Sequence, residues 1–179
     1  MDTQIYSLHE PDVYCVGKGK DHTPYEYGKK ASIVLTEKSL LIIGIASHDK
    51  HEHDSKLLKP ALDHAHEHRK TKITTVVVDK GYKGCMQYVE QEIIIPNKPL
   101  KRDTETQKKR KSYLCKKRST IEPVIGHLKS DFRLCKNWLK GSVGDEINLL
   151  MAACAWNLRK WLAIFFFLKK DGKFWLFCI

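Results

Sequence analysis

The sequence has little that could form a disulfide framework or a cysteine-based zinc site. Its six cysteines, at positions 15, 85, 115, 135, 154 and 178, lie far apart, and no two form a Cys-x-x-Cys pair. This spacing argues against a zinc ribbon and against a small disulfide-stabilised fold. Reduced, mostly buried thiols in a cytosolic protein fit the pattern best.

A secretion signal and a long uninterrupted apolar run are also lacking. The start, Met1-Asp-Thr-Gln, has neither a basic segment nor an apolar core. The apolar stretch 161–168 is too short to span a bilayer, and Lys169 and Lys170 interrupt the sequence after it. We therefore expect a cytoplasmic protein without a membrane partner, in which residues 169–179 form a tail beyond the last helix.

Acidic residues are scarce relative to basic ones. The 179 residues have a formal net charge of +11, and residues 101–140 contain 13 Lys or Arg against 4 Asp or Glu, a net charge of +9. Such a concentrated surplus predicts a polyanionic partner, most simply nucleic acid. A solvated helical face is the alternative. Four consecutive basic residues are candidate nucleic-acid contacts: Lys108, Lys109, Arg110 and Lys111.

The first hundred residues show the pattern of an α/β domain, which we expect to extend over residues 1–168. Short β-branched runs predict four strands, at 31–36, 40–46, 73–78 and 92–95. The first two of these strands are expected to form a hairpin. Apolar residues at helical spacing predict a helix over 54–68, and a weaker helical pattern covers 85–91.

The second part of the chain is expected to be mainly helical. Residues 97–112 are polar and basic, which predicts a mobile connector or a nucleic-acid-facing loop. Pro123 indicates either a helix that begins near Thr120 or a kink in a longer helix. A break is expected at 141–144, before a long apolar helix over 145–167. The order of elements predicts a mixed sheet flanked by helices.

Two short motifs contain residues suited to phosphodiester chemistry. In Val76-Val-Val-Asp79-Lys-Gly81 a carboxylate follows an apolar run, just before a glycine turn. Further along, Arg118, Glu122 and Lys129 are spaced by four and seven residues, which places them on one helical face. Because Mg²⁺ (or Mn²⁺) prefers carboxylate and water oxygens, Asp79 and Glu122 are the candidate catalytic residues and metal ligands. Arg118 and Lys129 are candidate phosphate contacts.

Each motif also has a purely structural interpretation. Asp79 has the sequence context of a turn-forming aspartate at the end of a strand. Glu122 is spaced to pair with Arg118, or to form a capping box with Ser119. Two groups of histidines add a rival site for Zn²⁺, although no cysteine lies among them. They are His48, His51 and His53, and His64, His66 and His68.

Taken together, the two motifs resemble those of the DDE transposases of bacterial insertion sequences. The third acid of that family lies in Y-x-x-R-x-x-x-E-x-x-x-x-x-x-K, which Arg118, Glu122 and Lys129 match, with Cys115 at the tyrosine position. The second acid opens a D-x-G-Y turn, as Asp79 does here. The similarity extends over residues 5–162, including Tyr6-Ser-Leu-His-Glu-Pro-Asp and Asn137-Trp-Leu-Lys-Gly141.

This resemblance implies an RNase H-like fold and Mg²⁺-dependent cleavage and strand transfer at transposon ends. The expected partners are transposon and target DNA, with a homo-oligomer for the full-length protein and a nucleoid-associated location. The family's first acid lies on a strand upstream of Tyr6. The resemblance therefore implies that the first catalytic strand is missing and that the chain is an inactive fragment. A non-catalytic DNA-binding module that uses residues 101–140 is the alternative.

Overall fold

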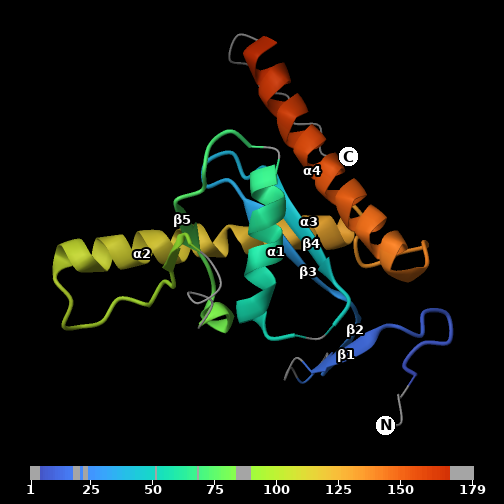
Figure 1. Ribbon diagram of the computed structural model, residues 1–179. Helices are drawn as coiled ribbons and strands as arrows, with labels where there is room; N and C mark the ends of the chain where they lie inside the picture. Colours follow the sequence, from blue (N-terminus) through green and yellow to red (C-terminus); the bar gives the residue numbers. More distant parts are fainter. Residues whose placement is uncertain are drawn as a thin grey trace.

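The computed structural model describes residues 5–17, 21, 24–50, 52–67, 69–83 and 90–169 (Figure 1). The strands are β1 Tyr14–Gly17, β2 Tyr25–Gly28, β3 Lys30–Leu35, β4 Ile42–His48, β5 Thr75–Val77 and β6 Glu92–Ile94. The helices are α1 Asp54–Glu67, α2 Glu105–Ser119, α3 Ile121–Ser130 and α4 Gly141–Lys169, with a single 3-10 turn, η1, at Lys80–Tyr82. These elements confirm mixed α/β content.

The strands form three separate pairs. β1 pairs with β2 and β3 with β4, both antiparallel, whereas β5 and β6 are parallel. Within the described ranges no ladder of hydrogen bonds joins these pairs, so the expectation of one mixed sheet is wrong for this chain. Apolar packing through α1 joins the β5–β6 pair to the β3–β4 pair, and the Tyr14 hydroxyl of β1 accepts from Lys30 N and donates to His48 O at the ends of β3 and β4.

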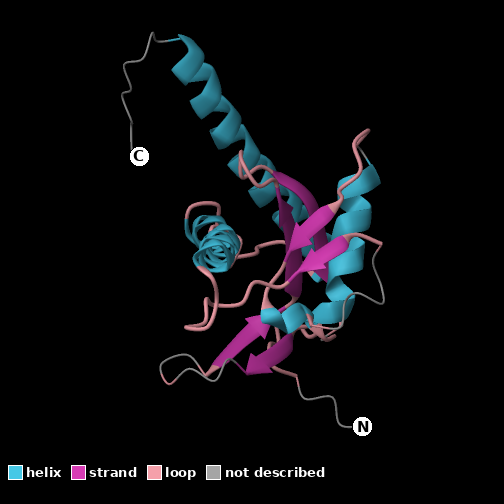
Figure 2. Cartoon of the chain, turned by 90° about the vertical axis from the view of Figure 1, so that its left-hand side faces the viewer, coloured by secondary structure: helices cyan, strands magenta, loops and turns pink. Residues whose placement is uncertain are grey.

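The hairpin β3–β4 is the centre of the structure and lies where the sequence predicts it. Leu40 adopts a left-handed conformation (φ 55°) in the turn, and a bulge follows Val34. α1 lies on one side of these strands and α2 on the other (Figure 2). The elements that belong to the candidate site are therefore arranged around this hairpin.

Helix α1 covers β4 at unusually short range. Its apolar face, which the sequence predicts, buries Leu57, Leu58, Ala61, Leu62 and Ala65. A Cβ atom at Gly44 of β4 would lie 2.3 Å from the backbone oxygen of Ala61. Glycine at this position therefore permits the close contact. Any larger residue would clash with the backbone of α1, and only a movement of the helix could relieve that clash.

Helices α3 and α4 complete the main core on the β3–β4 hairpin. The buried residues of this core are Ile42, Ile45, Val124, Leu128, Leu149, Ala152, Ala153 and Trp156. The Trp156 indole donates a hydrogen bond to Leu40 O at 2.7 Å. The Asn157 amide pairs with both backbone groups of Ile42, at 2.8 and 2.7 Å. These bonds fix the position of α4 along the hairpin.

The second half of α4 extends away from this core (Figure 1). Trp161 and Phe165 stack with ring centroids 6.0 Å apart, and both are exposed. Residues Gly141–Phe166 are long and apolar enough to cross a membrane by length and composition, with 22% of the most apolar window buried inside the protein. The buried part of α4 is its contact with the core.

Three helical expectations have different outcomes. A helix, α3, begins next to Thr120 with Pro123 in its first turn, as the first of the two alternatives predicts. The loop expected over 97–112 is wrong from Glu105 onward, because α2 begins there. Thr104 and Gln107 form a capping box, and Lys, Arg and Gln favour helices without needing an apolar face. The break expected at 141–144 is also wrong, since α4 begins at Gly141.

Three further regions differ from the predictions or lie outside the described residues. The hairpin β1–β2 was not predicted, although Tyr14-Cys-Val and Tyr25-Glu-Tyr contain strand-forming residues. The helix expected at 85–91 falls mostly outside the described residues, and so does the tail from residue 170. The strand expected at 73–78 is shorter, Thr75–Val77.

Replacing Gly44 by valine tests the close contact between α1 and β4. We expect Gly44→Val to lower the free energy of unfolding by about 1–3 kcal/mol, because overpacking forces α1 away from β4. Gly126→Ala is the control, since a Cβ there meets nothing within 4 Å and alanine favours helix α3. Urea denaturation of both variants measures the effect, and an unchanged midpoint for Gly44→Val would contradict this account.

Candidate metal and nucleic-acid site

Asp79 lies two residues beyond the end of β5, where the chain leaves the parallel strand pair. Val78 is buried, and its backbone N–H donates to Ile94 O at 3.0 Å, which anchors the preceding residue. The Asp79 carboxylate accepts a hydrogen bond from Lys80 N at 2.7 Å and caps η1, while the side chain stays 58% exposed. Asp79 is therefore a turn residue with an accessible carboxylate.

Glu122 reaches the same region from the first turn of α3. Val124 and Leu128 of this helix are almost fully buried, which fixes its rotation and turns Glu122 outward. A carboxylate in the first turn also interacts favourably with the positive end of the helix dipole. The capping-box interpretation of Glu122 is wrong, because Thr120 is the N-cap and Ser119 donates to Lys116 O.

Arg118 brings the two acids together. Its Nη1 lies 2.9 Å from Asp79 Oδ1, and its Nη2 donates to Glu122 Oε1 at 3.1 Å. The backbone of Thr120 stays helical between α2 and α3, so the spacing of four residues still pairs Arg118 with Glu122. Two carboxylates 43 positions apart thus share one guanidinium, while their roles in catalysis stay a prediction.

The two carboxylates fit part of a divalent-metal site. They are exposed, and they supply the hard oxygen donors that Mg²⁺ requires. Among the described residues no group of three Asp, Glu, His or Cys side chains is placed to hold a metal ion. Asp79 and Glu122 can therefore serve as ligands, but the described residues do not complete a three-carboxylate set.

A further acid next to the Asp79 turn was missed by the sequence reasoning. Asp54, at the start of α1, forms an ion pair with Lys30 at 3.0 Å. Its Oδ2 lies 2.9 Å from the position that a Cβ of residue 81 would take, so Gly81 leaves room for it. In the sequence, the only indication of this acid was its position at the start of the helix predicted over 54–68. Asp54 therefore lies against the turn that carries Asp79.

The histidines have structural contacts. Nε2 of His48 lies 2.9 Å from Ser32 Oγ, and burial lowers the pKa of His48 below its ordinary value. His53 contacts Ser55, and Nε2 of His66 accepts a hydrogen bond from Ile73 N. His51 and His68 lie outside the described residues. In the part of the chain that is described, the histidines form no metal-binding group, so nothing supports the zinc alternative.

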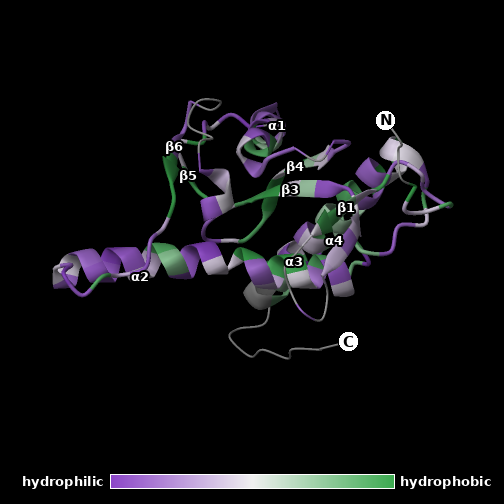
Figure 3. Ribbon diagram, turned by 90° about the horizontal axis from the view of Figure 1, so that it is seen from below, coloured by the Kyte–Doolittle hydropathy of each residue, from purple (hydrophilic) through white to green (hydrophobic). Residues whose placement is uncertain are grey.

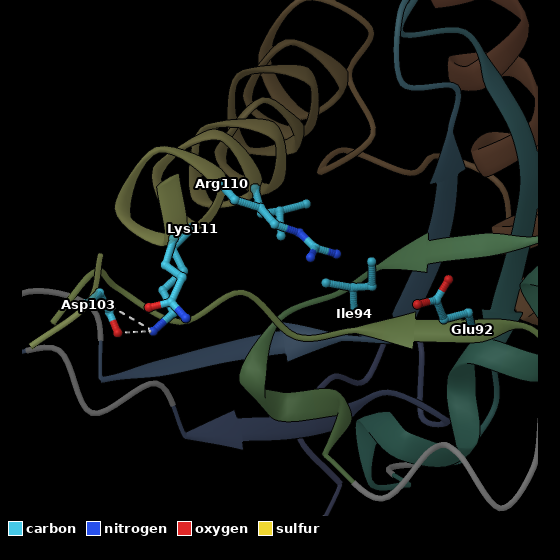
Figure 4. A pocket seen from close by; sticks show the side chains of 7 residues that line it. Glu92, Ile94, Asp103, Arg110 and Lys111 are labelled. Atoms are coloured by element: carbon cyan, nitrogen blue, oxygen red, sulfur yellow. Dashed lines mark hydrogen bonds and ion pairs between the residues drawn. The ribbon is translucent and has the colours of Figure 1, made fainter. Parts of the chain in front are cut away.

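The basic residues of α2 are partly neutralised by neighbouring acids. Lys108 pairs with Glu105 at 2.8 Å and Lys111 with Asp103 at 2.7 Å. Arg110 and Lys111 line a hollow of about 340 Å³ between α2 and β6 (Figure 4). No residue of α2 is buried, and the helix is hydrophilic along most of its length (Figure 3). This helix is thus an exposed, mainly cationic arm.

The position expected to be tyrosine holds Cys115, whose thiol donates to Asn97 O at 3.5 Å. The nearby Tyr113 points elsewhere: its hydroxyl donates to Glu37 at 2.6 Å, and this hydrogen bond raises the pKa of Tyr113. Tyr113 therefore ties α2 to the β3–β4 turn. It does not replace the missing tyrosine.

Lys129 lies seven residues beyond Glu122 on α3 and is half exposed, with its Nζ 4.0 Å from Glu26 Oε2 of β2. It borders a second hollow, which also contains Arg133, Lys136 and Trp138. The sequence analysis does not predict this hollow, since Trp138 enters it only as part of the motif Asn137-Trp-Leu-Lys-Gly141. The sequence pattern that could have indicated this hollow is a tryptophan with basic residues on both sides.

One comparison with known proteins gives a match. The family model described as the transposase DDE domain matches residues 2–158. No curated protein and no solved structure gives a significant match. The family match covers Asp79, Arg118, Glu122 and Lys129 together.

The shared guanidinium leads to a testable competition with metal. Removing the positive charge by Arg118→Gln should strengthen Mn²⁺ binding several-fold, because the guanidinium repels a divalent cation from the same two carboxylates. Asp79→Asn should weaken Mn²⁺ binding. Titration of Mn²⁺ followed by electron paramagnetic resonance measures both effects, with Arg159→Gln as a control for net charge. Weaker binding by Arg118→Gln than by Arg159→Gln would contradict the competition.

Proposed function

Because this chain belongs to the transposase DDE domain family, we propose that it takes part in phosphodiester cleavage and strand transfer at transposon ends. The family itself supports a role in DNA transposition and implies an RNase H-like fold and a DNA substrate. The observation that supports the chemical proposal best is the pairing of Asp79 and Glu122 with the single guanidinium of Arg118.

Asp79 and Glu122 are the residues that would hold Mg²⁺ or Mn²⁺. When bound, such ions activate an oxygen nucleophile and stabilise charge on the phosphate that is cut. Asp79 is positioned by the buried Val78 that precedes it, and Glu122 by the buried face of α3. Arg118 pairs with both carboxylates and offsets one of their two negative charges, and its fork of donors also suits a phosphate.

DNA binding is assigned to the exposed cations of α2 and to Lys129. Lys109 and Arg110 are exposed, and Lys108 can exchange Glu105 for a phosphate at small cost, since exposed ion pairs contribute about 0.2–1 kcal/mol. Lys111 is held more firmly, because both carboxylate oxygens of Asp103 accept hydrogen bonds from it and the Asp103 side chain is largely covered. We infer transposon ends and target DNA as the partners, homo-oligomer formation in the full-length protein, no membrane partner, and a cytoplasmic, nucleoid-associated location.

One observation favours the second candidate function, a non-catalytic DNA-binding module. The described residues bring together two carboxylates, whereas the resemblance implies three. Mg²⁺ tolerates depleted coordination poorly, so two ligands leave the nucleophile badly aligned. We propose that catalysis requires a third acid on an additional strand and that this chain is inactive without it.

Simultaneous replacement of Lys108, Lys109, Arg110 and Lys111 by alanine tests DNA binding. Affinity for duplex DNA should fall, and the slope of log K against log salt should become less steep, because fewer counterions are released. Fluorescence anisotropy with labelled duplexes at several salt concentrations measures both quantities.

The matched control removes four exposed lysines outside the basic region: Lys50, Lys56, Lys59 and Lys70. Both variants lose the same net charge, so a larger effect from the α2 variant locates the contact. Equal effects would indicate that net charge alone governs binding and that α2 is a solvated surface.

Strand transfer tests the catalytic proposal. The chain alone should give no strand-transfer product with Mg²⁺, and at most slight nicking with Mn²⁺. A version extended upstream by the family's acid-bearing strand should give product, because the third carboxylate completes the ligand set. Gel assays with labelled transposon ends measure product formation.

In the extended version, Asp79→Asn or Glu122→Gln should each abolish product, whereas Asp63→Asn, at an exposed acid of α1, should have no effect. Robust transfer by the short chain would show that another acid, such as Asp12 or Asp21, completes the site. Inactivity of the extended version would favour the non-catalytic module.

A further inference from the structure

A cationic hollow lies at the end of α3, away from the paired acids. It has a volume of about 420 Å³, and its lining residues are Lys129, Ser130, Arg133, Cys135, Lys136 and Trp138. Three of these are cations and none is a carboxylate. The hollow between α2 and β6 is different, because Glu92 and Asp103 line it together with Arg110 and Lys111 (Figure 4). The hollow at α3 therefore favours an anion, in a volume within the range of roughly 300–1,000 Å³ of small-ligand sites.

Trp138 gives this hollow an aromatic wall. Its side chain is 81% exposed, although the backbone around it is held in place. Asn137 accepts a hydrogen bond from Leu139 N at 3.0 Å and donates one to Asp145 at 2.8 Å. An indole presented to solvent by an ordered backbone offers a stacking surface at small entropic cost, and such surfaces bind nucleobases.

Arg133 occupies an unfavourable backbone conformation beside Trp138. Its φ of 54° lies in the left-handed region, which costs a side-chain-bearing residue about 1–2 kcal/mol. The neighbours explain the turn: Phe132 and Leu134 pack against the main core, and Leu134 N donates to Leu128 O at 2.9 Å. Arg133 and Cys135, between and after them, line the hollow instead. Glycine would relieve the strain, so the presence of arginine indicates a use for its side chain.

We propose that this hollow binds one unpaired nucleotide of a DNA strand, with its base stacked on Trp138 and its phosphates contacting Lys129, Arg133 and Lys136. The inference rests on the proposed function, which makes DNA the substrate. Stacking does not depend on the identity of the base, so the site binds the unpaired state and reads no sequence. Cations hold the phosphates on either side of the base.

The position on α3 connects this hollow with the paired acids. Lys129 follows Glu122 by seven residues, a rise of about 10 Å along the helix on the same face. That distance corresponds to roughly three steps along one strand of DNA, at 3.4 Å per step. One DNA strand can therefore contact Glu122 and the hollow while following a single helix.

Affinity for a duplex with one internal unpaired nucleotide tests the proposal, compared with the same duplex fully paired. Trp138→Ala should weaken binding to the bulged duplex by about 5- to 150-fold, the effect of losing one stacked base. Binding to the paired duplex should stay unchanged, and Trp138→Phe should retain much of the affinity. Trp161→Ala, at another exposed tryptophan outside the hollow, should match the original chain on both DNAs. Fluorescence anisotropy of labelled DNA measures all four proteins.

Arg133→Gly separates binding from folding. Glycine accepts the left-handed backbone, so this variant should melt at a higher temperature than the original chain. It should nevertheless bind the bulged duplex more weakly, with a salt slope reduced by about one. A purely structural role for Arg133 would leave affinity and slope unchanged and would overturn its assignment to the site.

The remaining outcomes distinguish this inference from the proposed function. Failure of the original chain to bind either DNA would overturn both. Normal duplex binding with equal affinities of Trp138→Ala and the original chain for the bulged DNA would overturn the nucleotide site alone. Equal weakening on bulged and paired DNA would show that Trp138 contacts duplex in general, and would also overturn it.

Discussion

The burial of Val124 and Leu128 against the β3–β4 hairpin is the constraint on which the site depends. Both side chains are 1% exposed, and they lie one turn apart on α3. On a helix of 3.6 residues per turn, Glu122 and Lys129 then project from the opposite face. The same contact that completes the core therefore fixes the direction in which a carboxylate and a cation face solvent. Trp156 and Asn157, bonded to the hairpin backbone, keep α4 in place beneath them.

Arg118 offsets part of the negative charge of this site. Two carboxylates brought together would repel each other, and a shared guanidinium reduces that repulsion while leaving a net negative charge for a cation. All three side chains are at least partly exposed, so their ion pairs are screened by water and break readily. The ion pairs therefore position the two acids but can be exchanged. In the proposed function, the acids can then bind a metal ion, and Arg118 can bind a phosphate.

The sequence predicts this site better than it predicts the surrounding structure. The positions of Asp79 and Glu122 follow from local rules, namely a strand that ends at a turn and a helix with a buried face. Helix α2 was missed because its stability comes from a capping box and helix-favouring cations, so residues 105–112 show no apolar period. The separation of the strands into pairs, and the hollow around Trp138, depend on contacts between distant segments. Short-range patterns do not encode such contacts.

The ion pairs show which basic residues are already paired with carboxylates and which can attract an anion. On α2 and at its end, Lys108, Lys111, Lys117 and Arg118 each have a carboxylate partner. A formal charge of +11 therefore overstates the field around this helix, since each pair has little net charge at long range. At the far end of α3 the balance differs, because three cations share a hollow that no acid lines. Lys129 has only a long contact there, 4.0 Å to Glu26, so a phosphate at that end has less carboxylate contact to displace than on α2. In the proposed function, the strongest anchoring of DNA therefore belongs at the C-terminal end of α3, about two helical turns from Glu122, while α2 contributes weaker contacts along its length.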